Sequence, residues 1–432
     1  METIRNKVKV IKDGMLIDGT GKDPIENAVI LVEGSRIKEV GEKKEVRIPT
    51  NARIIEGGGK TILPGLMDLH VHITPLNGPR DPTRAQSVEQ PCPDISTQKA
   101  RYWKLYQTPS NLWVLYGAYH AKKYLEAGFT TIRSLPTFTN SRNREGIALK
   151  KAIELELVPG PRIMCASDVG CTSSHIDYNT PITWPRSPED SADGVTEIRK
   201  RVRECVRERV DWIKTHASGS PVLKDTADWR NYTLEEFKAL VDEAHAWGKK
   251  VAVHCHGYQG AKNVIEAGVD TIEHGTALDD DDLEAMIEKS IILVPTIYVY
   301  KIFLSMYPNR STEGLRDMRY FRRAHERGVK IAMGTDMSIT APNHGDNAVE
   351  LELMVKYGMT EMEAIVASTK NSAEALGLEN QFGTIEKNKV ADIIIVEGNP
   401  LKDIKILQDK KNIRKVIKNG EIVVDREITT KD

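Results

Sequence analysis

The sequence predicts an α/β protein with a (β/α)8 TIM barrel and a small β-sandwich domain formed by both termini. Two observations support this prediction. Between residues 61 and 380, short apolar segments alternate with helical patterns, as they do in eight-stranded α/β barrels. On either side, residues 1–60 and 381–432 carry short β-branched segments that end in glycine. A chain of 432 residues is long enough for one large and one smaller domain.

The two terminal regions have the same texture. Residues 8–14, 15–21, 27–41 and 52–59 are each a strand-like segment that contains or ends in glycine. Residues 391–400 and 413–425 repeat the pattern, and Asn419-Gly420 predicts a hairpin turn. Neither region is large enough to form a good core alone, so we expect one composite sandwich from residues 1–60 and 381–432.

The central region predicts the barrel element by element. The expected strands are residues 61–73, 130–135, 162–167, 212–217, 250–256, 271–275, 292–297 and 330–336. Helical patterns separate them, among them residues 112–128, 233–248 and 315–328. The last two end in glycine, which is common at a helix C-terminus. Residues 75–110 follow the first strand and have no clear periodicity, so we expect a loop or lid over the active face.

Composition excludes several classes of protein. The chain is 40% hydrophobic and 28% charged, which is ordinary for a globular protein. A net charge of −1 gives no global attraction to nucleic acid or anionic membranes, and no apolar run approaches a membrane span. The N-terminus lacks a signal-peptide core, and the five cysteines are scattered. We therefore expect a cytoplasmic protein with reduced thiols that acts on a small molecule.

Six potential metal ligands lie at the ends of the expected strands: His70, His72, Lys214, His254, His274 and Asp336. Histidines two residues apart on a strand share one face, which inside a barrel is the interior. Each residue also has an ordinary explanation, such as a buried histidine pair or an aspartate that caps the next segment. Together, those explanations require separate coincidences on five strands, all at the end where barrel enzymes carry their chemistry. The pattern therefore predicts one metal centre, and so a hydrolase.

Lys214 is the unusual member of this set. A lysine at a strand end more often extends its amine to solvent, and an ammonium would repel metal cations. Reaction with CO2 would convert it to an anionic carbamate whose two oxygens could bridge two metals. Burial and nearby cations lower the pKa of a lysine, which favours the neutral amine that this reaction needs.

At this point the sequence resembles the amidohydrolase superfamily over nearly its whole length. The resemblance rests on residues 63–72 (LPGLMDLHVH), on the segments around Lys214, His254 and His274, and on residues 383–392 (GTIEKNKVAD). It is greatest to the imidazolonepropionase-like branch, which includes binuclear prolidases, Xaa-Arg dipeptidases and ochratoxin-type amidases.

The resemblance implies a role for each residue. His70, His72 and Asp336 would hold the more buried metal, and His254 and His274 the other. The Lys214 carbamate and a water or hydroxide would bridge the two. His256 and His175 would contact the substrate, although threonine and serine replace the branch's glycines before His175.

The expected mechanism follows from such a site. Two divalent metals, with zinc favoured and manganese, cobalt or iron also suitable, would activate a shared water and polarise the scissile carbonyl. Asp336 would carry a proton from that water to the leaving amine. Tyr258 and Tyr298, just past strand ends, are candidate hydrogen-bond donors to the substrate, with packing as the alternative.

The favoured function is hydrolysis of the amide bond of a dipeptide (Xaa-Pro-like) or an N-acyl or aryl amino acid. The alternatives are a cyclic amide or imide hydrolase, a deaminase, and a non-enzymatic scaffold. A deaminase usually has glutamate three residues after the first histidine of strand 5, where this chain has Gly257. A scaffold would be free to lose ligands, and this chain has all six. Homo-oligomerisation is common in such enzymes.

Overall fold

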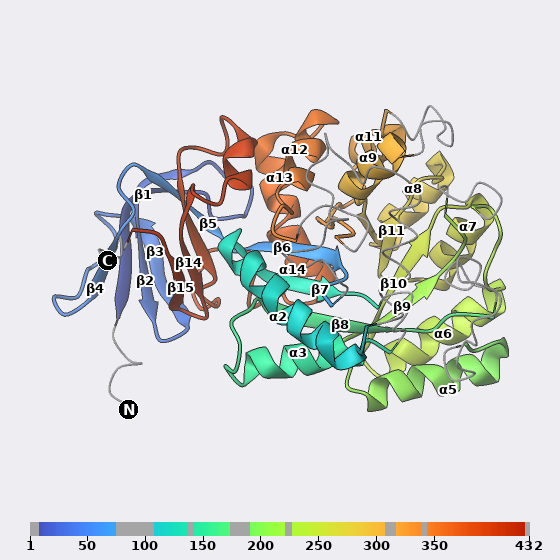
Figure 1. Cartoon of the computed structure of the whole chain (residues 1–432). Coiled ribbons are helices and arrows are strands. Elements are labelled where there is room, and N and C mark those ends of the chain that lie inside the picture. Colours follow the sequence, from blue (N-terminus) through green and yellow to red (C-terminus); the bar gives the residue numbers. More distant parts are fainter. Residues whose placement is uncertain are drawn as a thin grey trace.

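The computed structural model describes residues 8–74, 108–136, 142–172, 191–220, 227–306, 317–337 and 344–427. Two sheets organise this part of the chain, and helices surround the second of them (Figure 1). Most of the expected loop at 75–110, and the candidate residue His175, lie outside the described residues.

The second sheet is a nearly closed parallel barrel, which confirms the predicted fold class. Its strand order follows the chain without a crossover, from β6 to β12. The strands are β6 (Leu66–Val71), β7 (Phe129–Ser134), β8 (Arg162–Asp168), β9 (Trp212–His216), β10 (Lys250–Cys255), β11 (Thr271–His274) and β12 (Ile292–Val294). Every residue of β6, β7, β9 and β11 is buried, as expected for parallel strands with side chains packed on both faces.

The eighth predicted strand, residues 330–336, does not form a regular strand. Its backbone bonds to β12 on one side, where Ala332 N donates to Leu293 O at 2.9 Å. It bonds to β6 on the other, where Leu69 N donates to Met333 O and Asp336 N to His70 O, at 2.9 and 2.8 Å. The segment therefore bridges β12 and β6 and completes the barrel, but it gives up strand geometry at Asp336, whose φ is 55°.

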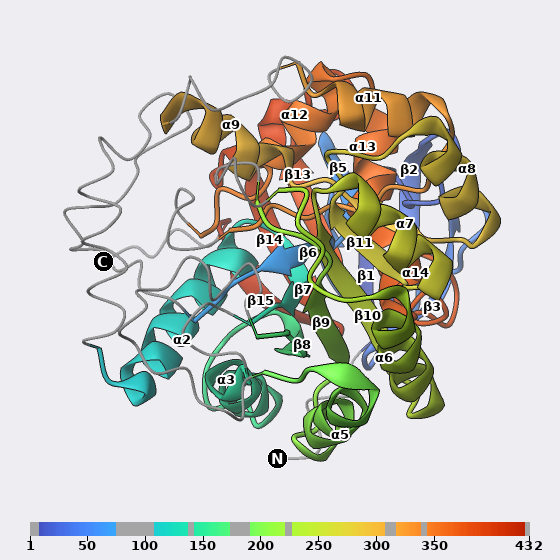
Figure 2. The ribbon, with the colours of Figure 1, turned by 90° about the vertical axis from the view of Figure 1, so that its right-hand side faces the viewer.

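Helices cover the outside of the barrel (Figure 2). They are α2 (Ser110–Glu126), α3 (Arg144–Glu154), α5 (Gly194–Arg207), α6 (Leu234–Ala246), α7 (Tyr258–Ala267), α8 (Asp280–Glu288), α9 (Ile297–Met306), α11 (Arg319–Glu326), α12 (Val349–Lys356), α13 (Glu361–Ala367) and α14 (Lys370–Leu376). The three helices named from sequence correspond to α2, α6 and α11. Helix α6 begins at a capping box, because Thr233 and Glu236 each bond to the other's backbone N–H.

Strands from both termini form one mixed sheet, in the order β15-β14-β13-β5-β1-β2-β3, with β4 beside β1. They are β1 (Lys9–Leu16), β2 (Ile25–Glu33), β3 (Arg36–Glu42), β4 (Arg53–Glu56), β5 (Lys60–Pro64), β13 (Ile393–Glu397), β14 (Ile413–Lys418) and β15 (Glu421–Asp425). Ile11, Ile30, Ile62 and Ile393 belong to one buried cluster, so the two ends share a core.

The described residues also test the predicted hairpin turn and show the state of four cysteines. Asn419 and Gly420 both have positive φ between β14 and β15, as the predicted hairpin turn requires. Cys165, Cys171, Cys205 and Cys255 are buried free thiols. Among the helices that the structure describes, none has the length and apolar character of a membrane span.

Candidate metal centre

The first half of the site forms where β6 meets the eighth segment. His72 Nε2 lies 3.0 Å from Asp336 Oδ1, and His70 Nε2 lies 3.6 Å from the same oxygen. His70, His274 and Asp336 each offer a ligand atom within 4.8 Å of the others. Burial would raise the pKa of Asp336, but the two histidines and Lys214 hold it below its ordinary value. The carboxylate is therefore charged and able to bind a cation.

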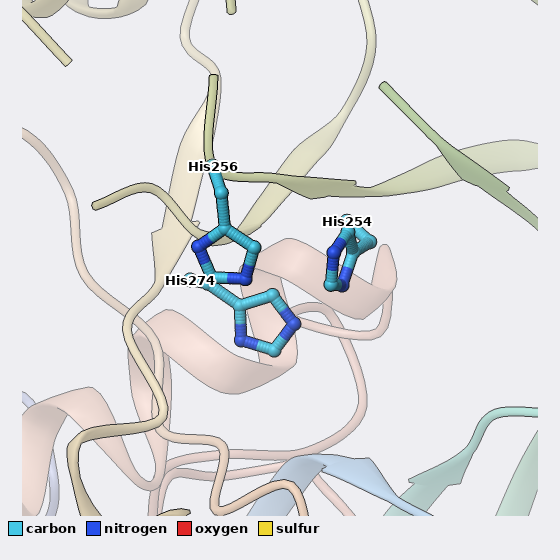
Figure 3. A group of neighbouring side chains, drawn as sticks. All are labelled: His254, His256 and His274. Carbon is cyan, nitrogen blue, oxygen red and sulfur yellow. The ribbon is translucent and has the colours of Figure 1, made fainter. Parts of the chain in front are cut away.

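The second half is formed by β10 and β11. The rings of His254 and His256 are 4.6 Å apart, as the same-face spacing predicts. The His256 ring stacks on that of His274 at 4.8 Å, and His254 lies beside them (Figure 3). The three side chains offer nitrogen atoms within 4.8 Å of one another. The ring of His274 is also 5.0 Å from that of His70, so it lies between the two halves.

Lys214 lies in β9 beside both halves. Its side chain is 3% exposed, and its Nζ has no hydrogen-bond partner in the described structure. Burial lowers the pKa of this amine to about 8, with Arg133 also lowering it and Glu273 opposing the shift. A buried, unpaired amine is costly unless something else satisfies it. The position suits a group that gains its partners when a ligand or a modification is present.

A buried ion pair between Glu273 and Arg133, which sequence reasoning missed, contacts His70 and orients its ring. Glu273 Oε2 is 2.7 Å from His70 Nδ1, and Arg133 Nη2 donates to Glu273 Oε1 at 2.6 Å. Burial would raise the pKa of Glu273, but Arg133 and His70 lower it to about 2. Burial lowers the pKa of His70 to about 4, so its ring is neutral. A carboxylate on Nδ1 leaves Nε2 as the lone-pair nitrogen, which is how metal-binding histidines are commonly oriented.

Asp68 joins β6 to the eighth segment. It accepts hydrogen bonds from His70 N at 3.1 Å, from Thr335 Oγ1 at 2.7 Å and from Asn347 Nδ2 at 2.6 Å. Burial raises its pKa to about 6 despite these bonds. The carboxylate fixes the backbone on both sides of the site, next to His70 and to Asp336.

Replacing Glu273 by glutamine should weaken metal binding and lower stability together. The variant loses the carboxylate that orients His70, which typically costs roughly 10–100-fold in metal affinity. It also leaves Arg133 buried without its countercharge, a change worth roughly 3–5 kcal/mol. Metal titration and urea denaturation measure the two effects. Glu266→Gln, which removes an exposed pair with Lys238, is the control and should change neither much. Unchanged metal affinity in Glu273→Gln would exclude the orienting role.

A tyrosine that the sequence did not single out contacts the site. The hydroxyl of Tyr300 lies 2.8 Å from His256 Nε2, and Thr276 Oγ1 lies 2.8 Å from His256 Nδ1. Tyr298, the expected tyrosine, is 1% exposed, whereas Tyr258 is 56% exposed on the first turn of α7. The substrate contacts assigned to Tyr258 and Tyr298 stay predictions.

Helix α9, which carries Tyr300, is anchored by a buried glutamate. Glu350 of α12 accepts hydrogen bonds from Ile297 N at 2.8 Å and Tyr298 N at 2.7 Å, the first two amides of the helix. These N–H groups lack partners inside the helix, so the carboxyl group satisfies them. Burial nevertheless raises the pKa of Glu350 to about 8, against the effect of the two bonds.

Glu350→Gln should change how stability depends on pH. The pKa of Glu350 is about 8 in the folded chain and near 4.5 when unfolded, so the folded state binds the proton more tightly. Stability from this group is thus present at low pH and is lost as pH rises from about 4.5 to about 8. Relative to the glutamine variant, the wild type should lose thermal stability over that window. Glu352→Gln on the same helix is the control, and parallel curves for wild type and Glu350→Gln would contradict the expectation.

The backbone is strained where the strands end. His274, Thr296 and Asp336 have φ values of 74°, 50° and 55°, a region that non-glycine residues rarely occupy. Thr296 Oγ1 is also 2.7 Å from His274 Nδ1. Strain of this kind persists where surrounding structure enforces it, and it clusters at functional sites.

Comparison with known proteins agrees with this geometry. The sequence profile of the amidohydrolase family matches residues 61–423. This chain belongs to the amidohydrolase family. Enzymes of this family are hydrolases whose general reaction is cleavage of carbon–nitrogen bonds, and they generally use a binuclear metal centre.

Several relatives resemble the chain over nearly its whole length. The ochratoxinase of Aspergillus niger is 30% identical over 450 residues, covering 96% of this chain and 86% of that protein. A crystal structure of a Xaa-Pro dipeptidase with bound methionine has a TM-score of 0.82 and 30% identity, covering 96% of this chain and 99% of that one. The imidazolonepropionase of Kosmotoga olearia is 24% identical and covers 92% of this chain and 91% of its own length. These relatives support the branch that the sequence motifs indicated.

The donor atoms of this amidohydrolase fit such a centre. Imidazole nitrogens and a carboxylate oxygen form two groups with His274 in common, and these atom types suit zinc and neighbouring divalent metals. Lys214 Nζ adds a buried position without a hydrogen-bond partner in the described residues.

Proposed function

We propose that this protein is a binuclear metal-dependent amidohydrolase that cleaves the amide bond of a dipeptide or an N-acyl or aryl amino acid. The observation that carries the proposal is the buried Lys214 amine, without a hydrogen-bond partner among described residues, beside two groups of metal-ligand atoms. A site for one metal would need only the histidines and Asp336. A lysine in this place would contribute as a carbamate, whose negative charge would offset that of a second cation.

In this proposal the candidate ligands are divided between two cations according to the half of the site in which they lie. His70, His72 and Asp336 would hold one cation, and the two histidines already lie 3.6 and 3.0 Å from the carboxylate. His254 and His274 would hold the other, and Lys214, once carboxylated, would supply an anionic ligand beside both groups. His256 also offers a potential ligand atom, but we assign it to the substrate, as the family resemblance implies, and its ring is oriented by Thr276 and Tyr300.

When bound, the two cations would lower the pKa of a water from 15.7 towards roughly 7 and polarise the scissile carbonyl. Asp336, charged and 3.0 Å from His72, accepts the proton of the attacking water and donates it to the leaving amine. The C–N bond breaks as the amine takes that proton, and the water oxygen and its second proton remain in the product carboxylic acid. His256 orients the substrate, and Tyr300 and Thr276 fix its ring.

The relatives support the substrate class. Ochratoxinase and the Xaa-Pro dipeptidase are each named for a substrate, and each is about as similar to this chain as the other. A cyclic amide or imide is the second candidate, favoured by the similarity to imidazolonepropionase. A deaminase is disfavoured, because Gly257 stands where such enzymes usually have glutamate.

A substrate screen with metal-loaded enzyme tests the proposal. The panel should contain Xaa-Pro and Xaa-Arg dipeptides, N-acyl amino acids, ochratoxin-like aryl amides and cyclic imides. We expect metal-dependent release of a free amine from one of the linear classes. Turnover of cyclic imides alone would favour the second candidate, and ammonia as the only product would indicate deamination.

A further inference from the structure

Helix α5 carries a buried arginine whose surroundings do not satisfy it. Arg201 is 3% exposed, and none of its three guanidinium nitrogens has a hydrogen-bond partner in the described structure. Its nearest acidic atom, Glu204 Oε2, is 3.6 Å from Nη1, beyond hydrogen-bond distance. Guanidinium stays protonated and offers five N–H donors, so burying it without acceptors is costly. The guanidinium of Arg201 therefore lacks hydrogen-bond acceptors that a bound group could supply.

Neighbouring arginines on α5 show the contrast. Arg199 donates to Asp242 and Glu243 of α6 at 2.7 and 3.0 Å, and Arg203 donates to Glu243 at 2.7 Å. The residues on either side of Arg201 therefore have carboxylate partners, although they are more exposed. In the described structure Arg201 does not pair with α6. It lines a different side of α5, where the described residues offer its guanidinium no hydrogen-bond acceptor.

That side of α5 lines a cavity of about 690 Å³. Arg142 and Arg144, before and at the start of α3, form part of the opposite wall. Figure 2 shows α3 and α5 next to each other on the outside of the barrel. None of the candidate metal ligands is among the described residues that line this cavity.

The charges in the cavity favour an anion. Its described lining contains the cations Arg142, Arg144, Lys200, Arg201 and Arg207, and the acids Glu197, Glu204 and Glu208. The acids are already engaged. Glu208 pairs with Arg142 at 2.7 Å and with Arg144 at 3.3 Å, Glu204 lies 3.3 Å from Arg142, and Glu197 accepts from the backbone N–H of Asp193. Lys200 and Arg207 have no ion pair in the described chain, so positive charge remains in excess.

We propose that this cavity binds a small molecule through a phosphate or carboxylate group, with Arg201 as the central contact. The planar guanidinium matches either oxyanion with two parallel hydrogen bonds. Water in the cavity would supply acceptors but would leave the excess charge uncompensated. Lys200 and Arg207, which also line the cavity, add to the attraction.

The test compares the wild type with Arg201→Met, Arg201→Lys and the control Arg203→Met, at constant ionic strength. Inorganic phosphate and acetate are the two probes, read by isothermal titration calorimetry and thermal unfolding. We expect one of them to bind and stabilise the wild type and Arg203→Met. Affinity should fall at least tenfold in Arg201→Met and less in Arg201→Lys, which keeps the charge but loses the planar fork. The better probe identifies the oxyanion.

Without either probe, Arg201→Met should unfold at the same temperature as the wild type or a higher one, because it removes an unsatisfied buried charge. A clearly lower unfolding temperature would mean that the chain itself provides the missing partner, and would overturn the proposal. An equal response of wild type and Arg201→Met would place the anion elsewhere, such as at the metal centre, and would also overturn it. So would the absence of any response.

Discussion

Replacing Lys214 by alanine should remove metal and activity together. The wild type should contain close to two divalent metal ions per chain, and the variant one or none. Turnover should fall by at least roughly 10³-fold, because removing even one hydrogen-bond donor from a preorganised site typically costs roughly 10²–10³ and here the second metal is lost as well. Metal analysis of the purified proteins and steady-state kinetics on the substrate identified by screening measure the two effects.

A second measurement addresses the carbamate itself. Enzyme loaded with metal in ¹³C-bicarbonate should show a carbamate carbon signal in the NMR spectrum that Lys214→Ala lacks. Lys250→Ala is a matched control, because Lys250 lies on the adjacent strand β10 at its opposite end, where its Nζ donates to Ala375 O. That variant should keep both metals and the signal. One metal in the wild type, with full activity in Lys214→Ala, would rule out the bridged centre.

Asp336→Asn should retain much of the metal and lose most turnover. Asparagine keeps an oxygen where the carboxylate meets His70 and His72, but it cannot accept the proton that the reaction releases. Removing a general base commonly lowers the rate by roughly 10²–10⁴-fold. Metal analysis and kcat on the same preparation separate the two roles. Near-normal turnover would exclude Asp336 as the proton carrier, and metal loss equal to that of Lys214→Ala would show that it acts mainly as a ligand.

The fold could be predicted because its signals repeat along the chain. Seven apolar segments became parallel strands, and both termini supplied strands to one sheet. The eighth segment was assigned as a strand because residues 331–333 have the same apolar character. It departs from strand geometry at Asp336, whose backbone is left-handed, and Gly334 just before it packs so closely that an added Cβ would lie 2.9 Å from His70 Cβ. Such contacts join residues far apart in sequence and leave no local pattern.

The candidate site divides in a similar way. Histidines, a lysine and an aspartate at strand ends were found by residue type and spacing. Glu273 was missed because alternation along a strand would direct it away from the side that carries His274. In the structure His274 has a φ of 74°, which breaks the alternation, so Glu273 contacts His70 while His274 still reaches the histidine cluster. The sequence signal that could have identified Glu273 was its position as a charged residue inside a short, otherwise buried strand.

Tyr300 was missed for a different reason. The sequence indicated tyrosines close to strand ends, and Tyr298 is the closer one. Because helix α9 begins at Ile297, side chains two residues apart point in different directions, and Tyr300 is the one that reaches His256. The precise start of a helix decides such a choice, and it is poorly defined by sequence.

The way the barrel is completed ties ligand binding to folding. Asp336 ends the irregular segment between β12 and β6, and Asp68 fastens that segment through Thr335. A cation held by Asp336 and by the histidines of β6 would draw together the same two edges that these hydrogen bonds join. Part of the free energy of cation binding therefore stabilises the closed barrel at this junction. Affinity for the cation is thus linked to the cooperativity of unfolding. A substitution at this junction can change both, even when every metal ligand is kept.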